Sequence, residues 1–288
     1  MCACSQRRTY PPCVPENHSE RLVQDMTIDA PGDAGLEILP LPAFNDNYIW
    51  TLRRGDKVVV VDPGDPAPVE SYLAREGLDL TAILITHHHA DHTGGIGALT
   101  ARRDIPVYGP AAADIAGVTA GLADGDSVDL PELDRAFEVL EVPGHTATHI
   151  AFLSGDLLFP GDTLFSAGCG RLLGGTAEQL HASLERLKDL PGSTRVYCTH
   201  EYTLANLKFA QAAEPDNAER DAWFAHCRSL RSDGQPTLPS TMERERAINP
   251  FLRTGSASVI KAVTRHTGRR PASDLACFTA LRAWKDEF

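Results

Sequence analysis

Histidine and aspartate side chains crowd the stretch THHHADHTGG, which directly follows the apolar run AILI. On an extended backbone successive side chains alternate between two faces, so His87 and His89 are expected on one side and His88 on the other. Asp91 and His92 follow after the chain has turned. Four ligands from one loop exceed what one tetrahedral ion needs if it must also hold a substrate, so the spacing indicates two metal ions.

Three further candidate ligands each follow a predicted strand. They are His145 in PGHTATH, Asp162 in FPGDTLF and His200 in CTHEY. In sheet proteins, ligands gather where strand ends open into loops. The resulting five histidines and two aspartates divide into two sets of three terminal ligands and one bridging carboxylate. Nitrogen and carboxylate ligands without cysteine favour zinc, with iron and manganese as the alternatives.

The elements expected to position these residues are short strands mixed with helices. Residues 36–61 predict strands with a hairpin turn at 54–56, followed by a helix over 68–76. The buried run LTAILI then predicts the strand that leads into the histidine cluster, and TGGIGALTARR a helix after it. Residues 126–166 predict further strands. TAEQLHASLERLKDL predicts an amphipathic helix with Thr176 as its N-cap.

The predicted secondary structure changes near Thr203 from mixed strands and helices to helices alone, and no strand is expected beyond this residue. Helices are predicted over 203–214, 216–232, 256–266 and 273–287. The segment at the start mixes Arg, Pro, Cys, Glu and Gly without periodicity and is predicted to be a disordered extension. The predicted domains are therefore an extension over 1–35, a catalytic domain over 36–203 and a helical domain over 204–288.

Composition limits the partners of the chain. Its 288 residues carry 27 Lys and Arg against 39 Asp and Glu, a net charge of −12 that disfavours nucleic acid and anionic membranes. The apolar runs are far shorter than the ~18 residues of a membrane span, and no apolar leader precedes the fold. The seven cysteines show no regular framework, which favours free thiols in a reducing cytoplasm.

The motifs THHHADHTGG, PGHTATH, GDTLF and THEY, in this order, resemble the metallo-β-lactamase superfamily, whose signature is HxHxDH. Longer strings resemble its glyoxalase II (hydroxyacylglutathione hydrolase) branch from Leu36 to Phe288: FNDNYIW, AGCGRLLGGTAEQL, THEYTLANLKFAQAAEPDN, PSTMERERAINPFLR and LRAWKDEF. The resemblance implies a four-layer αββα sandwich with the metals at one edge. It also implies a smaller, all-helical C-terminal domain that closes over the thiol side of the substrate.

The resemblance also implies the role of each ligand. His87, His89 and His145 would hold one metal, Asp91, His92 and His200 the other, and Asp162 would bridge them. Asp91 and Asp162 are in addition assigned as the catalytic residues. A hydroxide shared by the two cations would attack a thioester carbonyl. The leaving thiol has a pKa near 8.5 and departs as thiolate without a separate general acid.

Four side chains match positions at which the family binds glutathione, whose two carboxylates require a basic recess. They are Arg171 in GCGRLLGG, Tyr202 in HEY, and Arg282 and Lys285 in LRAWKDEF. Leu173 departs from the family, since many relatives have an aromatic residue there. This departure affects the expected affinity for glutathione more than the reaction type.

The implied activity is hydrolysis of S-D-lactoylglutathione and related S-acylglutathiones to D-lactate and glutathione by a monomeric enzyme. One alternative is a one-iron enzyme that oxidises glutathione persulfide, which generally lacks the full second metal set. Others are a β-lactamase or lactone hydrolase, disfavoured by the helical C-terminal domain, and an inactive binding module, which the complete ligand set does not support. Cys198 is a weaker candidate nucleophile, because a packed thiol is commoner at such a position.

Overall fold

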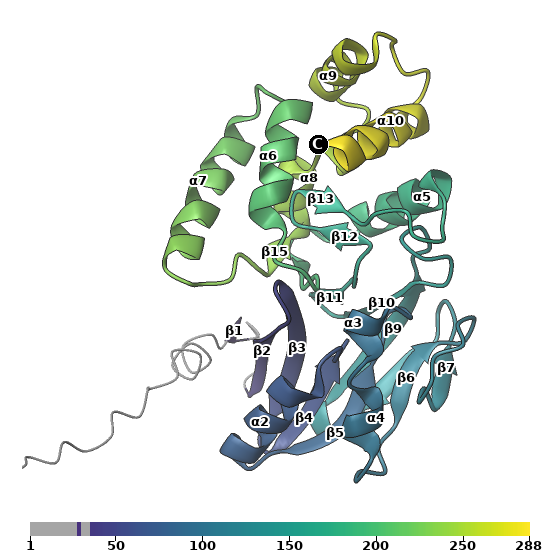
Figure 1. Ribbon diagram of the computed structural model, residues 1–288, viewed down its shortest axis with the longest axis vertical. Coiled ribbons are helices and arrows are strands. Elements are labelled where there is room, and N and C mark those ends of the chain that lie inside the picture. The colour runs from purple at the N-terminus through teal and green to yellow at the C-terminus, as the bar shows by residue number, and fades with distance from the viewer. Residues whose placement is uncertain (1–27, 30–34) are drawn as a thin grey trace, which may run out of the picture.

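A computed structural model describes residues 28–29 and 35–288, in which two β-sheets pack face to face (Figure 1). The first sheet has seven strands in chain order: β1 (Ile28–Asp29), β2 (Leu36–Ala43), β3 (Asn47–Arg54), β4 (Lys57–Val61), β5 (Asp79–Leu84), β6 (Val107–Pro110) and β7 (Ala120–Leu122). The second sheet has the order β15-β14-β11-β10-β9-β8. Its strands are β8 (Ser127–Leu130), β9 (Arg135–Glu141), β10 (Ile150–Ser154), β11 (Leu157–Phe159), β14 (Arg195–Val196) and β15 (Ser240–Thr241). Strands β12 (Leu164–Phe165) and β13 (Gly168–Cys169) form a separate ribbon.

Helices cover the outer faces of both sheets (Figure 1). Helices α2 (Pro66–Glu76) and α4 (Ile96–Thr100) cover the first sheet, and α5 (Ala177–Lys188) covers the second. The C-terminal helices are α6 (Thr203–Ala213), α7 (Ala218–Ser232), α8 (Met242–Ile248), α9 (Ala257–Thr267) and α10 (Asp274–Glu287), with short 3₁₀ turns at Pro131–Leu133 and Pro250–Leu252. The four-layer sandwich and the helical C-terminal part are therefore confirmed.

The VVVV run of β4 illustrates why these sheets are covered on both sides. Val59 and Val61 pack between the two sheets, whereas Val58 and Val60 pack beneath the helices α2 and α4. All four are at most 3% exposed. Because side chains alternate along a strand, an uninterrupted apolar run is stable only where both faces are buried. The same burial fixes the end of β4, and hence the loop that follows it.

The two sheets meet at the edge where the candidate ligands lie. Asn47 at the start of β3 forms an isolated β-bridge with His200, and Tyr48 N donates to the Thr199 carbonyl at 2.7 Å. Trp50 Nε1 donates to the Cys198 carbonyl at 3.0 Å. These contacts join segments about 150 residues apart in the sequence. They hold the loop after β14 against the loops of the first sheet.

Thr176 caps helix α5 as the sequence predicts. Its Oγ1 accepts from Gln179 N at 3.2 Å, and Gln179 Oε1 accepts from Thr176 N at 2.9 Å, which is a complete capping box. We expect Thr176→Ala to lower the free energy of unfolding by about 1 kcal/mol in urea denaturation, because the Gln179 N–H in the first turn of the helix loses its acceptor. Thr176→Ser keeps the acceptor and should retain the stability of the unaltered protein. Equal midpoints for the alanine and serine variants would contradict this role.

Two sequence-based expectations about elements are corrected by the structure. The expectation that no strand follows Thr203 is wrong, because Ser240 and Thr241 form β15, which pairs antiparallel with β14. Two residues at the edge of a sheet are too short to show a hydrophobic period. The helix expected over TGGIGALTARR forms, but it is shorter than the stretch, since α4 spans only Ile96–Thr100. A separate short helix, α3 (Ala90–Thr93), precedes it, and Gly94 and Gly95 lie between the two.

The predicted extension over residues 1–35 falls almost entirely outside the described residues. Within it, Ile28 and Asp29 form β1, which pairs with Ile38 and Glu37 of β2, so these two residues belong to the first sheet. The predicted disorder of the remainder stays a prediction. In the part of the chain that the structure describes, no helix has the length and apolar character needed to cross a membrane.

Candidate metal centre

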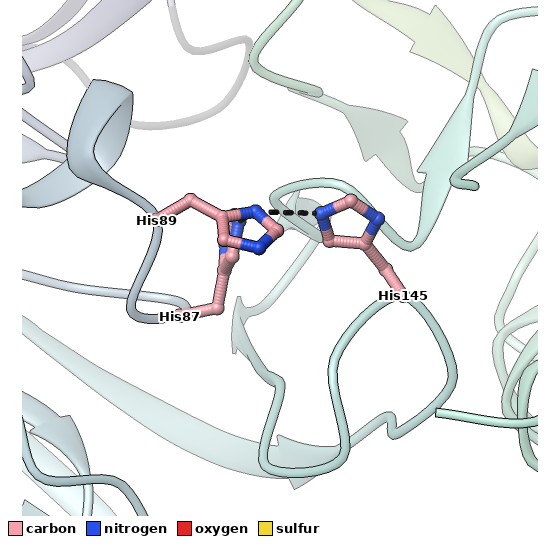
Figure 2. Close-up of side chains that lie close together, drawn as sticks. All are labelled: His87, His89 and His145. Atoms are coloured by element: carbon pink, nitrogen blue, oxygen red, sulfur yellow. Dashed lines mark hydrogen bonds between the residues drawn. The ribbon is translucent and has the colours of Figure 1, made fainter. Parts of the chain in front are cut away.

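Three histidines from two loops form the first group of candidate ligands (Figure 2). His87 and His89 lie in the loop after β5, and His145 lies in the loop after β9. His89 Nδ1 is 3.0 Å from His87 Nε2 and 3.0 Å from His145 Nε2, so the three nitrogens face one point. His88 is exposed, as strand alternation predicts.

The second group of candidate ligands comes from helix α3 and the loop after β14. Asp91 and His92 lie in α3, and His200 follows β14. Asp91 Oδ2 is 3.5 Å from His92 Nε2 and 3.6 Å from His200 Nε2. Asn47 Nδ2 donates to the same Asp91 oxygen at 3.2 Å, which fixes the carboxylate. The spacing of these ligand atoms is compatible with one cation.

Asp162, in the loop after β11, contacts both groups. Its Oδ1 is 3.6 Å from His92 Nε2, and its Oδ2 is 3.3 Å from His200 Nε2. The same Oδ2 is 3.6 Å from His145 Nε2, which belongs to the first group. The structure therefore brings all seven of the residues named as ligands into one cluster, with this carboxylate in the middle.

The cluster contains buried polar atoms that a cation would satisfy. Neither His92 Nε2 nor Asp162 Oδ1 has a hydrogen-bond partner among the described residues, although both atoms are buried. Buried polar atoms without partners are rare, because losing hydration on folding costs free energy that no hydrogen bond then offsets. A cation between them would replace that hydration for both atoms. Five imidazoles and two carboxylates are donors that suit zinc, iron or manganese, so the cluster is compatible with a binuclear metal centre.

Four of the five histidines turn Nε2 toward the cluster and hold Nδ1 against the protein. The Nδ1 contacts are Thr86 Oγ1 with His87 (3.1 Å), Asp62 Oδ2 with His92 (3.0 Å), the Arg171 carbonyl with His145 (2.8 Å) and Asp46 Oδ1 with His200 (2.8 Å). In metal sites, such outer contacts fix the tautomer and the orientation of the ring. The arrangement is therefore compatible with rings held in place to bind a cation.

Sequence reasoning missed three residues that support the ligands. Asp62 is 2% exposed at the end of β4, and its side chain accepts from Thr86 N at 2.8 Å and Thr86 Oγ1 at 2.7 Å. Asp46, in the turn before β3, accepts from His200. His149 Nε2 accepts from Asp162 N at 3.1 Å. The available signals were polar residues at strand ends: DPG, NDN and the second histidine of PGHTATH.

Burial and the central carboxylate set the protonation of the ligands. Burial lowers the pKa of His87 well below its ordinary value and also lowers the pKa of His89. Burial acts the same way on His92 and His200, but nearby carboxylates together outweigh it and raise the pKa of both rings: Asp162 with Asp62 beside His92, and Asp162 with Asp46 beside His200. Ligand imidazoles must be neutral, so cation binding at the second group is expected to release protons.

Two glycines allow the loops of the cluster to approach one another. A Cβ on Gly64, in the DPG turn after β4, would lie 1.9 Å from the Asp91 carbonyl oxygen. A Cβ on Gly170 would lie 2.0 Å from the Asp162 carbonyl oxygen and 3.1 Å from His145 Cβ. Side chains at these positions would push ligand-bearing backbone apart, which explains why glycine is needed there.

The four residues named as glutathione contacts line one recess of about 390 Å³, together with Phe165 and Cys169. The four are Arg171, Tyr202, Arg282 and Lys285. The Tyr202 ring stacks on the His200 ring, with centroids 4.7 Å apart and an interplanar angle of 2°. The recess therefore opens directly beside the ligand cluster.

The basic side chains of the recess differ in exposure. Arg171 has a side chain that is 69% exposed, whereas Arg282 is 3% exposed. Arg282 Nη1 donates to the carbonyls of Cys169 at 3.0 Å and Gly170 at 3.2 Å, so this guanidinium also holds the loop that carries Arg171. Burial, followed by the charge of Arg282, lowers the pKa of Lys285 to about 8.

Leu173 and Cys198 lie in contrasting environments. Leu173 is 53% exposed, and its N–H donates to the His145 carbonyl at 2.8 Å, so its backbone supports the cluster while its side chain faces solvent. Cys198 is fully buried in the core between the two sheets. Burial raises the pKa of its thiol, which makes this cysteine a packing residue rather than a nucleophile.

Comparison with known sequences agrees with this geometry. The profile of the metallo-β-lactamase superfamily matches residues 44–200, and that of the hydroxyacylglutathione hydrolase C-terminus matches residues 201–288. A hydroxyacylglutathione hydrolase of Chromohalobacter salexigens is 54% identical over 258 residues, covering 88% of this chain and 100% of that protein. One of Cupriavidus taiwanensis is 51% identical over 265 residues, with coverages of 88% and 99%.

Solved structures show the same fold. ETHE1 from Myxococcus xanthus superimposes with a TM-score of 0.59 and 27% identity, covering 87% of this chain and 99% of that one. TTHA1623 in a di-iron-bound form superimposes with a TM-score of 0.53 and 28% identity, covering 74% of this chain and 99% of that one. The latter structure is thus a neighbour in which two metal ions are bound.

Proposed function

The chain belongs to the hydroxyacylglutathione hydrolase family of the metallo-β-lactamase superfamily, and we propose on this premise that it hydrolyses S-D-lactoylglutathione and related S-acylglutathiones to D-lactate and glutathione. The observation that supports this most directly is the basic recess beside the ligand cluster, where Tyr202 stacks on His200. A thioester whose glutathione part occupies the recess would present its carbonyl to the cluster.

In this proposal the cluster holds two divalent cations, with zinc as the first candidate. His87, His89 and His145 would hold one, Asp91, His92 and His200 would hold the other, and Asp162 would be shared. Bound divalent ions would supply a water whose pKa lies near neutrality and would polarise the substrate carbonyl. Asp91 and Asp162 are proposed as the catalytic carboxylates, because an oxygen of each lies within 3.6 Å of an Nε2 atom of the candidate ligands His92 and His200.

The side chains of the recess bind and orient the glutathione part of the substrate. Arg171, Arg282 and Lys285 supply positive charge for its carboxylates, and Tyr202 supplies an aromatic face next to the reacting carbonyl. The leaving thiol has an ordinary pKa near 8.5, so it departs as thiolate without a dedicated proton donor. Residues 36–203 form the catalytic domain and residues 204–288 the glutathione-binding domain in this scheme.

The enzyme is proposed to act as a cytoplasmic monomer. The cysteines within the described residues, Cys169, Cys198, Cys227 and Cys277, are buried free thiols, which suits a reducing compartment. Its net charge of −12 disfavours nucleic acid as a partner. Size-exclusion chromatography with light scattering should give the 31.2 kDa of one chain.

The test of the proposed function is a thiol-release assay on S-D-lactoylglutathione with metal-replete protein. We expect release of one thiol per thioester hydrolysed, and loss of activity when a chelator removes the metal. The alternative, a one-iron enzyme that oxidises glutathione persulfide, is disfavoured because Asp91, His92 and His200 form a complete second ligand group. One iron per chain, with oxygen uptake on glutathione persulfide and no thiol release, would reverse this assignment.

Arg282→Ala is expected to raise KM about tenfold while kcat changes by less than about threefold, because a charge-assisted hydrogen bond to a substrate carboxylate is lost. Initial rates of thiol release give both constants. The metal content of the variant must be measured too, since Arg282 also holds the carbonyls of Cys169 and Gly170. Arg228→Ala, an exposed arginine on α7, is the matched control. An unaltered KM in the Arg282 variant would remove this residue from the glutathione site.

A further inference from the structure

One residue of the recess has a charge opposite to that of its neighbours. Asp286 lines the recess together with Arg171, Arg282 and Lys285, so three positive side chains share the space with one carboxylate. Its side chain is 37% exposed. A carboxylate is unexpected where the proposed substrate itself brings carboxylates, because like charges repel one another.

The two arginines of the recess converge on a single oxygen of this carboxylate. Arg282 Nη2 donates to Asp286 Oδ1 at 3.0 Å, and Arg171 Nε lies 3.4 Å from the same oxygen. The guanidiniums come from different elements, since Arg171 follows β13 and Arg282 lies in α10. Asp286 thus contacts both guanidiniums, as a substrate carboxylate would be expected to do.

The other two nitrogens of the Arg282 guanidinium, Nη1 and Nε, are poorly placed to donate a hydrogen bond to a substrate. Nη1 donates to the carbonyls of Cys169 and Gly170, and Nε is buried without a hydrogen-bond partner among the described residues. Nη2 is therefore the nitrogen that an entering carboxylate would meet, and Asp286 already engages it. A substrate must displace this internal partner or share the guanidinium with it.

We propose that Asp286 is an internal competitor for the carboxylate of the glutathione thioester, and that it sets how weakly substrate and product are held. The inference rests on the proposed function. Glutathione retains both carboxylates after the acyl group has left. Arg171 and Arg282, without Asp286 beside them, would therefore bind the product as well as the substrate. Interactions that bind both equally change KM and product inhibition together and leave the chemical step unchanged.

The test is Asp286→Asn, which keeps the shape of the side chain and removes its charge. We expect KM for S-D-lactoylglutathione and the inhibition constant of glutathione both to fall about two- to fivefold, with kcat within about twofold of the unaltered chain. Both gains should shrink at about 0.5 M salt, since exposed charges are screened. Asp286→Ala should change both constants in the same direction.

Glu287→Gln is the matched control, because it removes one negative charge from the next residue, which is exposed and does not line the recess. It should change neither constant. Raised or unchanged constants in Asp286→Asn would overturn the proposal and assign Asp286 to organising the arginines. Thiol release by the unaltered chain tests the proposed function alone. Calorimetric titration of the folded, metal-loaded variant with glutathione tests Asp286 alone, so the two failures are distinguishable.

Discussion

Replacing Asp162 with alanine is expected to lower kcat/KM for S-D-lactoylglutathione by at least about 10³-fold. The carboxylate lies within 3.6 Å of candidate ligand nitrogens in both groups, so its loss removes a side chain that connects them. Its removal also takes away the carboxylate that lies 3.6 Å from His92 Nε2 and 3.3 Å from His200 Nε2. The expected result is a site that binds metal weakly and no longer positions a water between two cations.

Thiol release and metal content must be measured on the same preparation of the Asp162→Ala variant. We expect fewer than two metal ions per chain after reconstitution, with circular dichroism unchanged, because the backbone N–H of residue 162 still donates to His149. Asp104→Ala is the control, since Asp104 is exposed and belongs to none of the candidate ligand groups. Two tightly held ions and undiminished turnover in the Asp162 variant would show that this carboxylate is not a shared ligand.

The candidate ligands were predictable because their positions obey two local rules. His87, His89 and His92 follow one strand at short spacing, and alternation separates His88 from them without knowledge of the fold. His145 and Asp162 follow other predicted strands, and strand ends that open at one edge bring their loops together. The sandwich itself was expected from the resemblance to the metallo-β-lactamase superfamily. The structure shows its physical basis in runs such as VVVV, which are uniformly apolar and are buried on both faces of the sheet.

The contacts that Asp46 and Arg282 form were not predictable, because their partners are distant in the sequence. Asp46 and His200 are 154 positions apart, and their contact depends on the bridge that joins β3 to the second sheet. Arg282 Nη1 contacts a carbonyl 113 positions away, through the docking of α10 on the loop after β13. No periodicity or spacing within one segment encodes such contacts. Such contacts follow from tertiary packing. Strand β15 does too, because its two residues form a strand by pairing with β14.

Asp62→Ala is expected to weaken metal binding about 10- to 100-fold, although Asp62 belongs to neither ligand group. Asp62 Oδ2 is 3.0 Å from His92 Nδ1, and this contact fixes which nitrogen of the ring faces the cation. Without it, the imidazole is free to rotate or to change tautomer. Competition with a chromogenic chelator gives the dissociation constants, and a variant that retains both ions as tightly as the unaltered protein would contradict this role.

The same substitution is expected to lower the free energy of unfolding of the metal-free protein by about 2 kcal/mol. The reason is that Thr86 N and Thr86 Oγ1, both buried, donate to Asp62 and would lose their acceptors. Asp62→Asn separates the two roles. Its remaining oxygen can still accept from Thr86 N, but its amide no longer offers a carboxylate to His92. Urea denaturation should therefore show a smaller loss of stability for Asp62→Asn than for Asp62→Ala, because the stability of the loop depends largely on the hydrogen bond. The metal affinity of Asp62→Asn should fall as far as that of Asp62→Ala, because the orientation of His92 depends on the charge of the carboxylate.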